Sequence, residues 1–167
     1  MAIEEMPQMT DPSVLIQLAE QLKNDLTTLR EVRGIGDDEM EAVYSLAHDF
    51  YRTGRYSDAH TLFEFLTLFD HLNVKYWMGL AATRQAQKDY RRALEAYAVV
   101  VGSLDVKNTD AAYYAAQCFL AVGDRESAKS SIAHVRHFAD PKTEEGRAVL
   151  VKTLRLEKAL QAAEQEG

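Results

Sequence analysis

The 167-residue chain has a single cysteine, Cys118, so it can build neither an internal disulfide nor a cysteine-rich zinc site. It has only three prolines, and no apolar run approaches the roughly 18 residues that span a bilayer. Positive charge is also scarce, because 26 Asp and Glu outnumber 19 Lys and Arg to give a net charge of -7. We therefore expect reducing surroundings and no broad electrostatic affinity for nucleic acid or an anionic membrane.

The N-terminal part differs from the rest in charge and composition. Glu4 and Glu5 lie where a signal peptide would carry positive charge, so we expect no cleaved leader. Residues 1–40 hold nine acids against three bases, whereas residues 41–167 hold 17 acids against 16 bases. The aromatic residues all fall between Tyr44 and Phe138, which predicts that the densest packing lies there. The two parts are therefore expected to have different roles.

The periodicity of the chain predicts helices throughout. Apolar residues recur at spacings of three and four, and no alternating strand pattern is sustained. We expect a first helix from a cap at Asp11 to Gly34, a second helix capped by Asp37 and ending at Gly54, and a long polar helix opened by Asp140. The first helix carries a stripe of leucines on one face. These are Leu15, Leu18, Leu22, Leu26 and Leu29.

Internal repeats define the predicted architecture. Ala59, Ala93 and Ala128 are spaced by 34 and 35 residues, and Tyr56 precedes Tyr90 by 34, which is the period of tetratricopeptide repeats. Alanine at these positions lets the two helices of a repeat approach closely. We predict an all-α fold of three tetratricopeptide-like helix pairs, stacked as a short right-handed superhelix between an N-terminal helix and a long C-terminal capping helix. The alternative is a helical array whose alanines coincide by chance.

This architecture divides the chain into three regions. Residues 1–36 form an acidic segment and helix expected to mediate self-association, residues 37–140 hold the three repeats, and residues 141–167 form the C-terminal helix and tail. The second repeat departs from the usual pattern, because Arg84 and Lys88 replace an aromatic and a small turn residue. No proline closes any repeat.

No residue pattern indicates an enzyme, a cofactor or a metal site. Cys118 lies in an apolar helix without a nearby base, which favours a structural thiol over a nucleophile. His134, His137 and Asp140 could share a helix face and hold a metal, but an ordinary helix surface is favoured, and we assign no metal. Acidic residues directly follow the glycine pair that ends at Gly36, which argues against phosphate binding.

One basic cluster interrupts the acidic chain. Arg84, Lys88, Arg91 and Arg92 are interspersed with acids such as Asp89, so a solvated helix face is favoured over a nucleic-acid patch. We therefore expect no nucleic-acid partner.

The repeats predict a binding groove. In stacked helix pairs the first helix of each repeat lines the concave face, and helical spacing places Tyr44, His48 and Tyr51 together there. The same face continues through the second and third repeats, where the candidate lining residues are Met78, Ala82, Gln85 and Tyr113. An exposed aromatic surface with few charges indicates a partner. The alternative is that the N-terminal helix folds over these residues and buries them as core.

Several of these motifs together resemble the class II chaperones of bacterial type III secretion. They are Tyr44-Ser45-Leu46-Ala47, Gly54-Arg55-Tyr56, Asp58-Ala59-His60, Trp77, Gly79-Leu80, Arg84-Gln85 and Ala115-Ala116-x-Cys118. The resemblance implies a small acidic protein of the bacterial cytoplasm, often dimeric, that binds hydrophobic translocator subunits of the secretion pore. It would keep them soluble and unassembled before export, without catalysis, a cofactor or membrane insertion of its own.

The resemblance also implies where the cargo lies. In such chaperones a short extended translocator segment occupies the concave groove, and the matching positions are Tyr44, His48, Tyr51, Met78, Ala82, Gln85 and Tyr113. His48 departs from the pattern, because relatives often have an aromatic residue there. The other functional hypothesis is a tetratricopeptide-repeat scaffold or regulatory adaptor that binds a peptide of another protein. A carboxylate clamp of the co-chaperone type is missing, since its positions hold residues such as Gly79, Asp110 and Tyr114.

Overall fold

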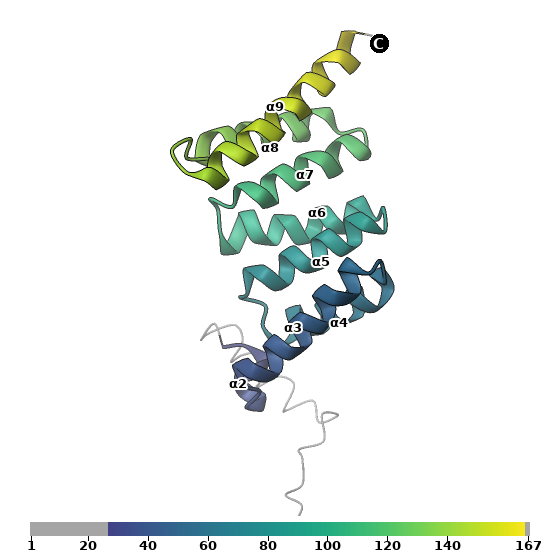
Figure 1. Ribbon diagram of the computed structural model, residues 1–167, viewed down its shortest axis with the longest axis vertical. Helices are drawn as coiled ribbons and strands as arrows, with labels where there is room; N and C mark the ends of the chain where they lie inside the picture. The colour runs from purple at the N-terminus through teal and green to yellow at the C-terminus, as the bar shows by residue number, and fades with distance from the viewer. Residues whose placement is uncertain (1–26, 166–167) are drawn as a thin grey trace, which may run out of the picture.

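The computed structural model describes residues 27–165, and in that range every regular element is a helix. In chain order the elements are α2 (Leu29–Arg33), α3 (Asp37–Arg52), α4 (Tyr56–Phe69), α5 (Val74–Ala86), α6 (Tyr90–Val99), the π-helical turn η1 (Val100–Leu104), α7 (Thr109–Ala121), α8 (Arg125–Phe138) and α9 (Glu144–Gln165). Three helix pairs, α3 with α4, α5 with α6 and α7 with α8, follow one another along the long axis (Figure 1). The predicted tetratricopeptide-like stack is confirmed.

The stack has two layers. Helices α3, α5, α7 and α9 lie nearer the viewer in Figure 1, and α4, α6 and α8 lie behind them. The alanines that define the repeat lie where the layers meet, because Ala59, Ala93 and Ala128 are all 0% exposed. Gly79 adds a further close approach, since a Cβ at this position would overlap the ring of Phe63 on α4. The small residues therefore set the distance between paired helices, as the sequence predicts.

The turn inside each pair has the same backbone geometry. Gly54, Lys88 and Gly123 stand at equivalent positions with φ angles of 77°, 63° and 83°. At each turn the next amide donates back to a carbonyl of the first helix, as Asp89 N does to Arg84 O at 2.9 Å. This left-handed conformation suits glycine. Lys88 adopts it with backbone strain, at the turn position that glycine occupies in the other two helix pairs.

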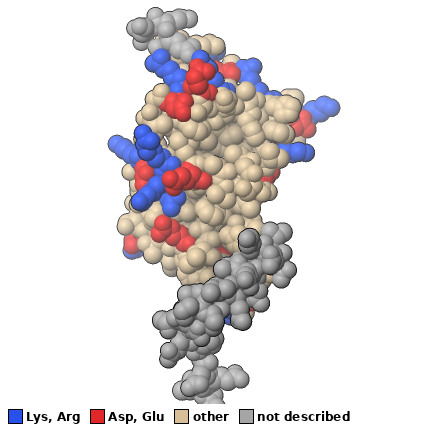
Figure 2. Space-filling model, turned by 180° about the vertical axis from the view of Figure 1, so that it is seen from behind, with Lys and Arg blue, Asp and Glu red and all other residues tan. Residues whose placement is uncertain are grey.

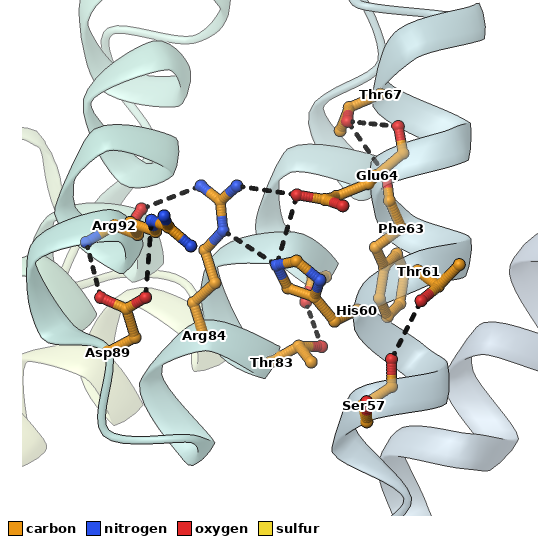
Figure 3. A network of polar contacts seen from close by, with 11 residues as sticks. Ser57, His60, Thr61, Phe63, Glu64, Thr67, Thr83, Arg84, Asp89 and Arg92 are labelled. Carbon is orange, nitrogen blue, oxygen red and sulfur yellow. Dashed lines mark hydrogen bonds and ion pairs between the residues drawn. The ribbon is translucent and has the colours of Figure 1, made fainter.

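Arg84 ties the first two repeats together (Figure 3). Its Nη1 donates to the carbonyl of Arg92 on α6 at 3.1 Å, and its Nη2 lies 3.4 Å from the carboxylate of Glu64 on α4. Its Nε donates to Nε2 of His60 at 3.4 Å. The side chain is only 14% exposed. For Arg84 the expected solvated helix face is therefore wrong, because its guanidinium is mostly buried and its hydrogen bonds and ion pair join α4, α5 and α6.

Several sequence-based helix ends need correction. Gly36, not Asp37, is the N-cap of α3, and the carboxylate of Asp37 pairs with Arg30 instead. Helix α9 begins at Glu144, because Asp140 first forms a turn in which its carbonyl accepts from Thr143. The expected start of the first helix at Asp11, and the leucines up to Leu26, lie outside the described residues. None of the helices described between residues 27 and 165 has the length and apolar character needed to cross a membrane.

Candidate peptide-binding groove

Two adjoining hollows lie along the layer of α3, α5 and α7. The first, of about 390 Å³, and the second, of about 460 Å³, share Tyr51, Met78 and Ala82. Among the other residues predicted from the sequence, Tyr44 and His48 line the first hollow and Gln85 lines the second. The shared residues make the two hollows one elongated surface, which we call the groove. Its shape suits an extended chain more than a compact ligand.

Tyr44 lines the first hollow and also packs against the core. Its ring lies 6.1 Å from that of Phe63 and 5.8 Å from that of Tyr76, measured between centroids. The ammonium of Lys75 lies 4.7 Å from the Tyr44 ring centroid and pairs with Glu41 at 3.2 Å. The ring is half-buried, and Phe63 and Tyr76 hold it from α4 and α5. Such a pre-positioned aromatic is suited to anchor an apolar side chain.

Tyr51 lies at the junction of the two hollows. Its ring is half-buried and lies 5.6 Å from that of Tyr56. Burial, followed by the influence of Tyr56 and Tyr114, raises the pKa of the Tyr51 hydroxyl. The phenol is therefore neutral at physiological pH and offers a donor beside an apolar ring. His48, one turn earlier on α3, is exposed at the rim.

A chain of hydrogen bonds crosses the second hollow. The Tyr97 hydroxyl donates to Oε1 of Gln85 at 2.8 Å, and Nε2 of Gln85 donates to Oε1 of Gln117 at 3.0 Å. Nε2 of Gln117 then donates to the Tyr113 hydroxyl at 3.0 Å. Tyr113 itself lies outside the two hollows and is joined to them through Gln117. This chain links α5, α6 and α7 and fixes the orientation of the Gln85 amide.

Sequence reasoning missed two aromatic residues of the second hollow. Tyr97, on α6, and Tyr114, on α7, both line it, and their rings stack with centroids 6.2 Å apart. Tyr97 is 1% exposed, and burial raises the pKa of its hydroxyl. The repeat period held a signal for this position, because Tyr97 follows Phe63 by 34 residues and both line the groove. No comparable pattern distinguishes Tyr114 from its neighbour Tyr113.

Most side chains that line the groove are uncharged. Its surfaces are aromatic rings, aliphatic side chains and amides, and its charged groups are Lys75 and Asp110 in the first hollow. Cys118 lies beneath it at 0% exposure, and burial raises the pKa of its thiol to about 11. A protonated, inaccessible thiol agrees with the structural role expected from the sequence.

The fold and the repeat pattern define a tetratricopeptide-repeat protein, and residues 40–73 and 74–100 match the tetratricopeptide repeat family. Low calcium response locus protein H of Yersinia pestis is 33% identical over 117 residues, which are 70% of this chain and 69% of that protein. Chaperone protein SicA of Salmonella typhimurium is 32% identical over 140 residues, which are 83% of this chain and 84% of that protein.

Solved structures of type III secretion chaperones have a similar fold. SycD, the type III secretion chaperone of Yersinia enterocolitica, crystallised with a peptide of the translocator YopD, is 29% identical with a TM-score of 0.72 and covers 78% of this chain and 98% of its own. PcrH of Pseudomonas aeruginosa, crystallised with the chaperone-binding region of PopD, is 28% identical with a TM-score of 0.73 and covers 78% and 97%. The chain belongs to the family of type III secretion translocator chaperones.

Proposed function

We propose that this protein binds an extended, largely apolar segment of a hydrophobic translocator in the groove and keeps that translocator soluble and unassembled in the bacterial cytoplasm before export. The observation that carries the proposal is the elongated aromatic groove of a chain in the translocator chaperone family. The structures of SycD with a YopD peptide and of PcrH with a region of PopD support it. The proposed action is binding alone, without catalysis.

Each groove residue has a proposed role. Tyr44 and Tyr51 are the aromatic anchors for apolar cargo side chains, because both rings are half-buried and lie beside other aromatic rings. Met78 and Ala82 provide the floor shared by both hollows. Gln85 has one further N–H and one further lone pair beyond its two bonds, which suit the backbone of an extended peptide.

His48 and Tyr113 are proposed to contact the cargo at the edges of this surface. His48 is exposed beside the first hollow, with its ring 6.2 Å from that of Tyr44. Tyr113 is half-buried and hydrogen-bonded to Gln117. Both can reach a peptide longer than the two hollows without forming the main anchor sites.

We also propose that the protein forms a homodimer through its N-terminal helix, as expected from the leucine stripe between Leu15 and Leu29. Removing residues 1–33 should give a monomer in sedimentation velocity, whereas the full chain should sediment as a dimer. A full-length chain that stays monomeric at high concentration would contradict this.

The cargo proposal is tested by titrating the full-length protein into a fluorescently labelled peptide of the PopD chaperone-binding region and recording anisotropy. Specific saturable binding is expected, with a scrambled peptide of the same composition as control. Equal binding of the native and scrambled peptides would contradict recognition of a translocator segment and favour a less specific scaffold. Co-expression with candidate translocators, followed by purification and mass spectrometry, then identifies the natural cargo.

A further inference from the structure

A hollow separate from the groove lies between the second and third repeats. It measures about 290 Å³, and α6, α7 and α8 all contribute side chains to its lining. Figure 2 shows the molecule from the side of α4, α6 and α8, where charged side chains gather at the edges and leave a broad uncharged area between them. Among the described residues, no Asp, Glu, Lys or Arg lines this hollow. We call the space between α6, α7 and α8 the back hollow.

The repeat period shows how the second junction between repeats differs from the first. At the first junction, Arg84 bonds with His60 and pairs with Glu64, which joins α5 to α4 (Figure 3). The equivalent positions one repeat later, 34 or 35 residues along the chain, line the back hollow and are all apolar. They are Leu94, Ala98 and Phe119. The polar network of the first junction is therefore replaced by apolar side chains at the second.

Small side chains leave the floor of the back hollow open. Ala112 and Ala115 on α7 both line it and are 3% and 6% exposed. The equivalent positions at the first junction hold the much larger Trp77 and Leu80. Because alanine replaces a large side chain at both positions, α7 leaves room there for a ligand.

The backbone of α6 also changes beside the back hollow. Helix α6 continues into the π-helical turn η1, in which the amide of Asp105 donates to the carbonyl of Val100 at 2.7 Å. Val101 of this turn lines the hollow. The equivalent helices of the other two pairs, α4 and α8, are α-helical from end to end. Such π-helical turns occur frequently at functional sites, so this departure from the repeat agrees with a binding site.

His134 on α8 brings a polar group to this apolar hollow. It belongs to the lining, and its ring centroid lies 4.7 Å from that of Phe138. Its Nε2 is buried, and no group of the described residues forms a hydrogen bond with this atom. Ser131, which also lines the hollow, donates its hydroxyl to the carbonyl of Ser127 at 3.0 Å instead. A buried ring nitrogen without a partner costs free energy, so a ligand that supplies a donor is favoured.

We propose that the back hollow binds a small, neutral aromatic molecule whose single N–H or O–H group donates to Nε2 of His134. An apolar cavity of about 150 Å³ is enough to bind benzene, so the volume here has room for a fused bicyclic ring such as that of indole. The ring of Phe119 and the alanine methyl groups suit a flat apolar body. A charged ligand is disfavoured, because the described lining holds no counter-charge. The site is distinct from the groove, since no residue lines both.

The first test titrates indole into the full-length protein and follows the methyl groups by NMR. Resonances of Val101, Ala98 and Ala112 should shift with a dissociation constant of about 0.1–1 mM, as expected for a ligand of this size. Methyl resonances of Met78 and Ala82 in the groove should not move. Benzofuran is the matched ligand, because it has the same shape with an oxygen in place of the N–H. It should bind several-fold more weakly, since it has no group that donates to His134.

Three variants test the site itself. His134→Phe keeps a ring but removes the acceptor, so it should bind indole and benzofuran equally. Ala98→Leu adds bulk to the hollow and should weaken indole binding about tenfold or more. Ala133→Leu is the matched control, because it makes the same substitution one repeat later at an exposed position of α8 that does not line the back hollow. It should leave the indole affinity unchanged, and circular dichroism checks that all three variants retain their helices.

Several outcomes would overturn the inference. One is the absence of any shift at millimolar indole, and another is a set of shifts confined to methyl groups of the groove. Parental indole affinity in Ala98→Leu would show that the ligand lies elsewhere. An undiminished preference for indole over benzofuran in His134→Phe would show that Nε2 is not the acceptor. Failure of the PopD-region peptide to bind would contradict the proposed function alone, because the two sites share no lining residue.

Discussion

Replacing Tyr51 with alanine should weaken cargo binding much more than it weakens the fold. Tyr51 is the only tyrosine that lines both hollows, so its removal opens the groove at the junction of the two hollows. Truncating an aromatic anchor of this kind costs about 2 kcal/mol, which corresponds to about a 30-fold loss of affinity. Because the ring is half-buried against Tyr56, we also expect the free energy of unfolding to fall by about 1 kcal/mol.

The control must lower stability without touching the groove. Tyr56 is unsuitable, because it is half-buried and its ring lies 5.6 Å from that of Tyr51. Leu66 is better, because it is 0% exposed on α4 and lines neither hollow. Leu66→Ala should lower the free energy of unfolding by about 2–5 kcal/mol while the folded protein binds the PopD-region peptide with unchanged affinity.

The assay pairs urea unfolding, followed by circular dichroism, with peptide anisotropy at a temperature where every variant is folded. Tyr44→Ala should behave like Tyr51→Ala in affinity, with a larger loss of stability because its ring also contacts Phe63 and Tyr76. Two results would refute the reasoning. One is parental peptide affinity in both tyrosine variants, and the other is a loss of affinity in Leu66→Ala equal to theirs.

Three further predictions concern the scaffold. Lys88→Gly should raise the free energy of unfolding by about 1 kcal/mol in urea melts, because glycine adopts the left-handed φ of 63° without strain. Ala93→Glu should unfold the array, since a charge would enter a fully buried helix contact, and retained helicity with an unchanged melting temperature would show that the repeat phase is wrong. Cys118 should react with iodoacetamide at pH 8 only when the protein is unfolded, because burial raises its pKa to about 11.

The repeat architecture was predictable because it rests on short-range geometry. The spacing of Ala59, Ala93 and Ala128 reflects the length of one repeat, and their small, fully buried side chains reflect the close approach of paired helices. The spacing of Tyr44, His48 and Tyr51 follows from the helical period, so their grouping on one face of α3 was also predictable. Local periodicity therefore located the first hollow and part of the second.

The remaining features depend on contacts between distant segments. Arg84 was expected on a solvated face, but it bridges Glu64 and the Arg92 carbonyl across three helices, which no local pattern indicates. Asp37 was expected to cap α3, yet Arg30 on the preceding helix competes for its carboxylate. In both cases a charged side chain found its partner through the packing of helices, and the sequence alone does not show which helices meet.

The hydrogen-bond chain in the groove explains how a surface for apolar cargo can contain so many polar groups. Tyr97 and Gln117 each form one hydrogen bond with the Gln85 amide from another helix, so the amide is already oriented before cargo binds. A free glutamine would lose side-chain entropy when cargo bound, whereas this one has lost it on folding. Tyr97→Phe tests the point, because it removes one hydroxyl and leaves the ring stacked on Tyr114. We expect a several-fold loss of peptide affinity in the anisotropy assay, and parental affinity would mean that the orientation of Gln85 contributes nothing to binding.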